Sequence, residues 1–95
     1  MILFHASNID FNNFDNKFIG SGGGSYGLGE GFYFTTEKNL ASLYGNILYT
    51  VEIKEADIDT FHDHEYLVKE AKNIKIIKKE ILDNGTNWYG SNRNL

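Results

Sequence analysis

Two neighbouring stretches of the sequence decide the fold: Gly29-Glu30-Gly31-Phe32-Tyr33-Phe34-Thr35-Thr36 and Leu40-Ala41-Ser42-Leu43-Tyr44-Gly45. The first is an aromatic and β-branched run of the kind found in strands. Thr36 can cap a helix from Glu37 to about Tyr44, and Gly45 suits the position just after that helix. A strand therefore delivers Tyr33 and a short helix delivers Tyr44. Because glycine-rich sequence precedes both rings, we expect a pocket between them rather than packing alone.

Most of the remaining chain has the pattern of short strands joined by turns. Apolar runs or apolar–polar alternation predict strands over 1–6, 46–54, 58–61, 65–68 and 74–81. In the last of these, the apolar side is expected to consist of Ile74, Ile76, Ile77 and Ile81. Many short strands with one or two short helices predict an α+β domain, followed by a turn and tail over 82–95.

Two further segments have a less regular pattern. The segment from Gly20 to Gly31 holds seven of the ten glycines and predicts either a surface loop or a mobile flap over a pocket. Its Gly-x-Gly-x-x-Gly match leads into a strand rather than a helix, so it does not predict a dinucleotide-binding turn. Phe11, Phe14 and Phe18 follow at helix-like spacing, which indicates packing against a core.

Length, charge and composition exclude several classes of protein. A chain of 95 residues, 41% hydrophobic and 15% aromatic, is expected to be one folded domain. The formal charge of −4, with Arg93 as the single arginine, argues against binding nucleic acid through its phosphates. The absence of cysteine excludes disulfides and thiolate chemistry. No apolar run approaches the roughly 20 residues that span a membrane, and no signal pattern opens the chain, so we expect a cytoplasmic protein.

Four side chains are candidates for a binding site. His5 lies in the first strand and could donate a hydrogen bond to a ribose hydroxyl or a carboxamide, with Ser7 on the same face. Two phenol rings, Tyr33 and Tyr44, could sandwich a flat cationic heterocycle such as the nicotinamide of NAD+. Glu65 precedes an apolar strand, so its carboxylate could reach the edge of a cleft.

Each of these residues also has an ordinary structural explanation. A histidine within a strand is often a buried hydrogen-bonded group, single tyrosines often belong to the core, and a lone glutamate is often solvated. His62 and His64 alternate on one face, but two histidines are too few for a metal site, and no metal is predicted.

Three motifs, in order, resemble the ADP-ribosyltransferase superfamily in its His-Tyr-Glu branch. That branch includes poly-ADP-ribose polymerases and diphtheria-type toxins, and the chain is most similar to its small bacterial and phage members. The motifs are Leu3-Phe4-His5-Ala6-Ser7, then Gly29 to Thr35 with Ala41-Ser42-Leu43-Tyr44, and then Glu65-Tyr66-Leu67-Val68 with Ile74-Lys75-Ile76. The resemblance covers 1–81. Ala6 stands where glycine is usual, and the short segment between Tyr44 and Glu65 lacks the usual acceptor-binding insertions.

The resemblance implies a split pair of antiparallel β-sheets with an NAD+-binding cleft between them. It implies catalytic roles for His5, Tyr33 and Glu65. It implies that NAD+, as a substrate, contacts His5, Ala6, Ser7, Tyr33, Phe34, Ser42 and Tyr44. The expected activity is mono-ADP-ribosyl transfer to a macromolecular acceptor, a host protein if the chain is an effector of a phage or mobile element.

Two alternatives remain open. A non-catalytic protein of the same fold could block a host partner by surface contact, without any chemistry. Transfer of an RNA 2′-phosphate to NAD+ on a related fold is less favoured, because that reaction needs several basic residues for RNA phosphates.

Overall fold

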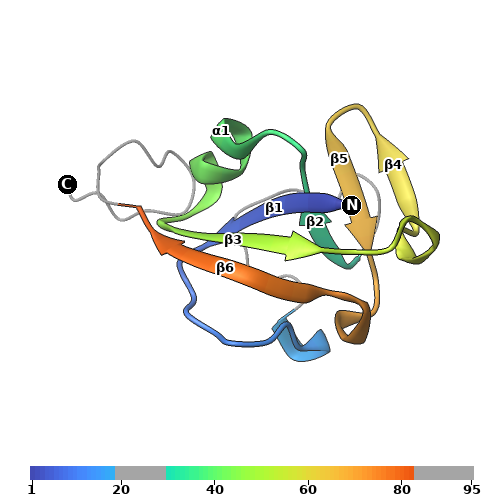
Figure 1. Cartoon of the computed structure of the whole chain (residues 1–95), viewed down its shortest axis with the longest axis horizontal. Helices are drawn as coiled ribbons and strands as arrows, with labels where there is room; N and C mark the ends of the chain where they lie inside the picture. Colours follow the sequence, from blue (N-terminus) through green and yellow to red (C-terminus); the bar gives the residue numbers. More distant parts are fainter. Residues whose placement is uncertain (19–29, 83–95) are drawn as a thin grey trace.

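Two three-stranded antiparallel sheets make up the fold (Figure 1). The computed structural model describes residues 1–18 and 30–82, apart from the side chain of Phe18. Sheet A has the strand order β1-β3-β6, with bounds Ile2–Ser7, Ile47–Glu52 and Lys75–Ile81. Sheet B has the order β2-β5-β4, with bounds Phe32–Phe34, Glu65–Val68 and Thr60–His62. The predicted α+β class and the pair of antiparallel sheets are confirmed.

Within residues 1–18 and 30–82, one short helix and four single 3₁₀ turns accompany these strands. Helix α1 spans Lys38–Ala41 and continues directly into η2, Ser42–Tyr44. The other turns are η1, Asn16–Phe18, η3, Glu55–Asp57, and η4, Ala71–Asn73. In the part of the chain that the structure describes, no helix has the length and apolar character to cross a membrane. The expected flap is described only from Glu30 onward, and the expected tail beyond Leu82 lies outside the described residues.

The start of α1 differs from the prediction that Thr36 caps it. Glu37 occupies the N-cap position in an extended conformation, and its side chain makes no capping bond. Thr35, rather than Thr36, bonds to the backbone at the start of the helix, because its Oγ1 accepts a hydrogen bond from the Glu37 N–H at 3.1 Å. The backbone of Thr35 is hydrogen-bonded to Phe4 of β1, and this contact determines where the helix starts.

Strand β3 has two buried faces rather than the single one predicted. Ile47, Tyr49 and Val51 face the main core, as the alternation predicts, and Ile53 continues that face beyond the strand. Leu48, on the opposite face, is also fully buried, because Ala6 of β1 and Ala41 of α1 pack against it. Helix α1 therefore covers the back of sheet A while sheet B covers its front.

The apolar side predicted for the last strand is correct only in its first half. Ile74 is buried and Ile76 packs against the core, whereas Ile77 is 48% and Ile81 is 65% exposed. The reason is a bulge, since Thr50 pairs with Lys78 but Val51 pairs with Ile76. Ile77 is thus left without a partner in the β3–β6 register, and the bulge changes which residues of the strand face inward.

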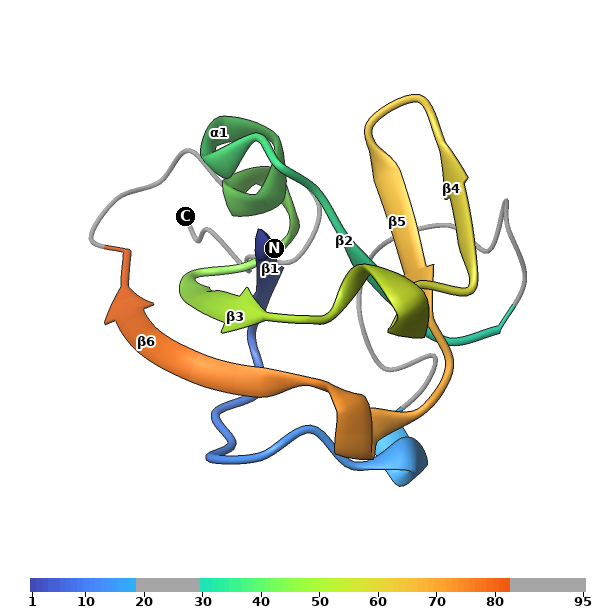
Figure 2. The ribbon, with the colours of Figure 1, turned by 45° about the vertical axis from the view of Figure 1, so that its right-hand side comes forward.

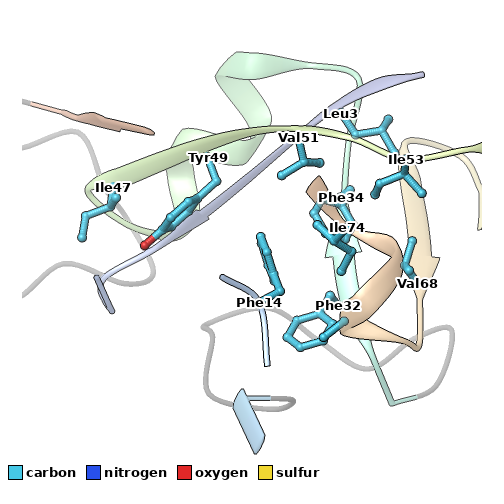
Figure 3. Packing of buried hydrophobic residues seen from close by; sticks show 11 residues of the cluster. Leu3, Phe14, Phe32, Phe34, Ile47, Tyr49, Val51, Ile53, Val68 and Ile74 are labelled. Carbon is cyan, nitrogen blue, oxygen red and sulfur yellow. The ribbon is translucent and has the colours of Figure 1, made fainter. Parts of the chain in front are cut away.

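Aromatic rings fill the space between the two sheets (Figure 3). Phe32 and Phe34 project from sheet B, Tyr49 projects from sheet A, and Phe14 lies among them. The prediction that the early phenylalanines are packing residues is confirmed for Phe11 and Phe14, but only the single turn η1 forms in this segment.

The two sheets are joined at one corner by backbone hydrogen bonds between β1 and the end of β2. Phe4 and Thr35 form an isolated bridge, with N–H to oxygen distances of 2.8 Å and 3.0 Å. Around this joint the sheets diverge, and α1 and the β4–β5 hairpin stand on either side of β2 (Figure 2).

Gly45 is required by close approach rather than by the left-handed conformation expected after a helix. Its φ of 174° is extended backbone that any residue can adopt. A Cβ at this position would lie 2.4 Å from the backbone carbon of Ser7, so η2 and β1 are closer here than any side chain allows. Gly45 therefore sets the distance between the turn that carries Tyr44 and the strand that carries His5.

We predict that Gly45→Ala destabilises the domain by about 1–3 kcal/mol, because backbone on both sides must move to admit the methyl group. The free energy of unfolding in urea measures this. Asn46→Ala is the matched control, since Asn46 is exposed and contributes its backbone N–H, not its side chain, to the bond with Asn8. Equal stability of the two variants would contradict the close-approach explanation.

Candidate functional site

His5, Tyr33 and Glu65 come from three strands that are neighbours in space. β2, which carries Tyr33, contacts β1 through the Phe4–Thr35 bridge and pairs with β5 along its full length. Glu65 is the first residue of β5, as the sequence predicts. The short strand β2 is therefore the centre of the candidate site.

The imidazole of His5 is hydrogen-bonded to the backbone of Tyr33. Nδ1 lies 2.8 Å from the Tyr33 carbonyl oxygen, and because a carbonyl can only accept, Nδ1 carries the proton. Burial lowers the pKa of His5 from the usual 6.5, and the bond to Tyr33 opposes this only in part. At neutral pH the ring is uncharged, and its Nε2 is a hydrogen-bond acceptor.

This protonation state changes the role expected for His5. The sequence suggested a donor to a ribose hydroxyl or carboxamide, but the N–H is already used within the fold. The half-buried ring can instead accept a hydrogen bond at Nε2 from a ligand hydroxyl. A ribose hydroxyl can make such a bond, whereas a carboxamide would have to present its NH₂ group.

The neighbours of His5 along β1 are occupied within the fold. Ala6 is buried on the opposite face, against Ala41 and Leu48. Ser7 is buried, and its Oγ accepts a hydrogen bond from the Ile9 N–H at 3.0 Å. Contacts from these two residues to a ligand would therefore come from their backbone groups.

The other three candidate residues, Phe34, Ser42 and Tyr44, differ in how far their side chains are available to a ligand. Phe34 is 2% exposed and is a core residue whose ring lies 5.4 Å from that of His5. The Ser42 hydroxyl donates to the Asn39 carbonyl at 2.9 Å. Tyr44, half-buried, ends η2, and η2 packs against β1. Tyr33 and Tyr44 thus lie on two elements that both contact β1.

Tyr33 and Glu65 project from the same face of sheet B. Phe32 and Phe34 point into the core, so the side chain of Tyr33 between them points to the other face. Tyr33 pairs with Leu67, and Glu65 lies two residues before Leu67 on the same strand. Such diagonal neighbours lie about 7–8 Å apart, with somewhat less between their Cβ atoms, which is within reach of an aromatic and a long side chain. Both side chains are half-buried, and the fully buried Leu67 lies next to them.

Sequence reasoning missed two residues that surround His5. The Phe14 ring meets His5 edge-on at 5.2 Å between ring centroids, and the Tyr49 ring lies 6.2 Å away. The spacing of the early phenylalanines and the alternation of β3 did predict that both residues are buried. The contacts of Phe14 and Tyr49 with His5 join residues that are distant in sequence, so no local pattern predicts them.

Residues 62–65, considered above as a metal site, form the tip of the β4–β5 hairpin. His62 Nε2 lies 3.4 Å from an oxygen of Asp63, and both side chains are well exposed. Across residues 1–18 and 30–82, no group of three or more His, Cys, Asp or Glu is arranged to hold a metal ion.

Comparison of the chain with protein-family models, with curated proteins and with solved structures found no match. What the site can do is therefore argued from its own geometry. That geometry provides a neutral imidazole acceptor that is bonded to the backbone of Tyr33 and lies against core rings. The Tyr33 side chain and the Glu65 carboxylate lie on the other face of sheet B.

We predict that the domain loses stability as the pH falls below about 6.5, because unfolded His5 takes up a proton that folded His5 resists. This contribution is fully present above the unfolded pKa and is lost progressively as the pH falls toward the lowered folded pKa. One such group gives at most about 1.4 kcal/mol per pH unit. His5→Asn, which keeps an N–H donor and does not titrate, should flatten the curve of unfolding free energy between about pH 7 and pH 5.

The exposed residue His62 provides the control for this prediction. His62→Asn should leave the pH dependence as in the wild type. An unchanged slope in His5→Asn would show that His5 is not the group that titrates.

Proposed function

We propose that this chain is a mono-ADP-ribosyltransferase that moves ADP-ribose from NAD+ to a macromolecular acceptor. One observation carries the proposal. The residues of its His-Tyr-Glu pattern, far apart in sequence, are held on adjacent strands, with His5 bonded to the backbone of Tyr33 and Glu65 on the Tyr33 face of sheet B. The resemblance of the motifs gives this arrangement its chemical meaning.

The residues present fit the recognition of NAD+ as a substrate. Nε2 of His5 accepts a hydrogen bond from a ribose hydroxyl, and the backbone at Ala6 and Ser7 contacts the carboxamide. The rings of Tyr33 and Tyr44 enclose the nicotinamide, whose positive charge and aromatic faces both favour contact with phenol rings.

The carboxylate of Glu65 acts at the reacting ribose. Cleavage of the nicotinamide–ribose bond builds positive charge on the ribose, as in other glycosyl transfers. A fixed carboxylate stabilises that charge and orients the neighbouring hydroxyl, an effect worth roughly 3–4 kcal/mol, or about 10²–10³ in rate. The lowered pKa of His5, caused by burial, adds to this, because an uncharged ring places no like charge beside the developing cation.

The acceptor is proposed to be a host protein, and the chain an effector of a phage or mobile element acting in the cytoplasm. The net charge of −4 supports a protein acceptor over a nucleic acid. The segment from Tyr44 to Glu65 consists of β3, η3 and β4 with short connections, so recognition of the acceptor must use this compact surface.

We predict that Glu65→Gln lowers transfer about 10²–10³-fold while changing the affinity for NAD+ little, since the carboxylate acts mainly on the transition state. Incorporation of label from adenine-labelled NAD+ into a bacterial lysate measures transfer, and calorimetry measures NAD+ binding. Glu70→Gln, which alters an exposed glutamate beyond the other end of β5, is the matched control and should transfer as the wild type does.

Two results would contradict the proposal. Equal loss of transfer and NAD+ binding in Glu65→Gln would make Glu65 a structural or binding residue. An absence of label even with the folded wild type would favour the non-catalytic protein that blocks a host partner by contact.

A further inference from the structure

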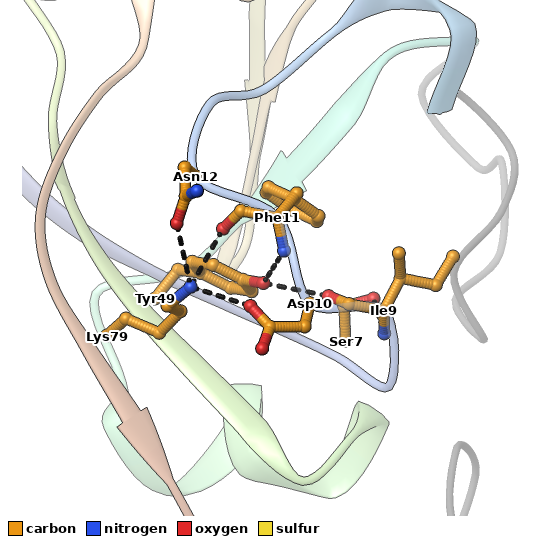
Figure 4. A network of polar contacts seen from close by, with 7 residues as sticks. All are labelled: Ser7, Ile9, Asp10, Phe11, Asn12, Tyr49 and Lys79. Atoms are coloured by element: carbon orange, nitrogen blue, oxygen red, sulfur yellow. Dashed lines mark hydrogen bonds and ion pairs between the residues drawn. The ribbon is translucent and has the colours of Figure 1, made fainter.

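Residues 9–16, called the strap below, cross from sheet A to the turn that follows sheet B. At its first end the strap is held by Tyr49 of β3, whose hydroxyl donates to the Ile9 carbonyl at 2.7 Å and accepts from the Phe11 N–H at 2.9 Å (Figure 4). The rings of Phe11 and Tyr49 also stack, with centroids 4.4 Å apart and planes within 6°. Burial raises the pKa of Tyr49, so the hydroxyl stays protonated and keeps both bonds.

Lys79 of β6 holds the same end of the strap through hydrogen bonds from its exposed ammonium group. Its ammonium group donates to Asp10 Oδ1 at 2.6 Å, to the Phe11 carbonyl at 3.2 Å and to Asn12 Oδ1 at 3.1 Å (Figure 4). The β3–β6 register pairs Lys79 with Tyr49, so two neighbouring strands hold one short stretch of the strap.

The second end of the strap is attached to η4, the turn that connects β5 of sheet B to β6 of sheet A. Oδ1 of Asn16 accepts a hydrogen bond at 2.9 Å from the N–H of Ala71, the first residue of η4 after β5. The strap is therefore held at one end by sheet A and at the other by η4, and the position of its middle is determined by both attachments.

Phe14 is carried in that middle part and lies against His5. Its side chain is 6% exposed, and its ring meets the imidazole edge-on at 5.2 Å and 74°. On its other sides it contacts Phe32 at 5.1 Å and Phe34 at 5.5 Å. Phe34 and Tyr49 also lie against His5, at 5.4 Å and 6.2 Å between ring centroids, so three rings surround the imidazole.

We propose that Phe14 is a positioning residue for His5, holding the imidazole so that Nε2 faces the NAD+ ribose. The proposal rests on the function proposed above. The torsion that orients a histidine ring is broad, and one hydrogen bond at Nδ1 leaves the ring free to tilt about that bond. An edge-on ring held by a strap with two attachments removes this freedom. The site is thus aligned by a segment that need not touch the ligand.

A matched variant at Phe32 distinguishes the positioning role from the ordinary explanation that Phe14 only fills the core. Phe32 is 4% exposed, lies in the same cluster and touches Phe14. Among the residues that the structure describes, the rings in contact with His5 are those of Phe14, Phe34 and Tyr49, so Phe32 does not touch it. Phe14→Leu and Phe32→Leu remove the same atoms from one core, but only the first removes a neighbour of His5.

The test combines nitrogen NMR of the imidazole of His5, recorded without ligand, with NAD+ binding by calorimetry. In Phe14→Leu we expect the pKa of His5 to rise toward 6.5, the second tautomer to appear, and the dissociation constant for NAD+ to increase about tenfold. In Phe32→Leu the spectrum and the affinity should stay as in the wild type. Lys79→Met, which loosens the strap from the surface without opening a cavity, should shift His5 in the same direction as Phe14→Leu.

Equal effects of Phe14→Leu and Phe32→Leu on the His5 signals, or no effect of either, would overturn the positioning role. If Phe14→Leu does not fold, an unchanged His5 spectrum in Lys79→Met would overturn it. If the folded wild type fails to bind NAD+, the proposed function falls. The NMR comparison then still decides whether Phe14 orients His5.

Discussion

The hydrogen bond from His5 to the Tyr33 carbonyl, beside the Phe4–Thr35 bridge, is the constraint on which the rest of the structure depends. The described strands form two sheets, and the backbones of the two sheets pair only at this corner, where β1 meets the end of β2. Because the sheets are otherwise held by side-chain packing, the corner fixes which residues face one another between them. It also fixes the candidate site, since the same carbonyl belongs to the residue expected to contact nicotinamide.

A chain this small has few apolar residues with which to hold two sheets together, and it uses rings and saturated polar contacts to do so. Tyr49 contributes a ring to the core and a hydroxyl to two backbone groups of the strap. Those backbone groups lie where no strand partner could satisfy them, and leaving them unpaired in a partly buried position costs about 1–3 kcal/mol each. The Tyr49 side chain therefore provides the two hydrogen bonds that a neighbouring strand would otherwise provide.

Local patterns in the sequence predicted the strands well and their surroundings less well. The alternation of 46–54 and the apolar run 65–68 located β3 and β5, because burial on a sheet face leaves a direct trace at every second residue. Three predictions were wrong for a common reason: the cap at Thr36, the conformation expected of Gly45 and the burial of Ile77. Each is determined by a contact or register with a distant strand, and neither propensity nor spacing records it.

In the candidate site, too, the sequence predicted the strands that carry the residues but not the contacts between distant segments. Strand alternation and the start of β5 placed Tyr33 and Glu65 on their elements, and the resemblance connected them. The tautomer of His5 could not be predicted, since it follows from a carbonyl that lies 28 positions away in the sequence. The ring of Phe14 beside it comes from an irregular segment, whose path is set by Lys79 and Asn16 rather than by its own periodicity.

The hydrogen bond from His5 to the Tyr33 carbonyl bears on how related sequences should be interpreted. Its proton joins two sheets, so a relative has a structural reason to keep the histidine whatever its function. Glu65 differs, because in residues 1–18 and 30–82 its carboxylate makes no hydrogen bond or ion pair that supports the fold. As homologues are collected, a retained histidine is explained by architecture alone, and the residue at the start of β5 is the one that bears on the proposed transferase activity.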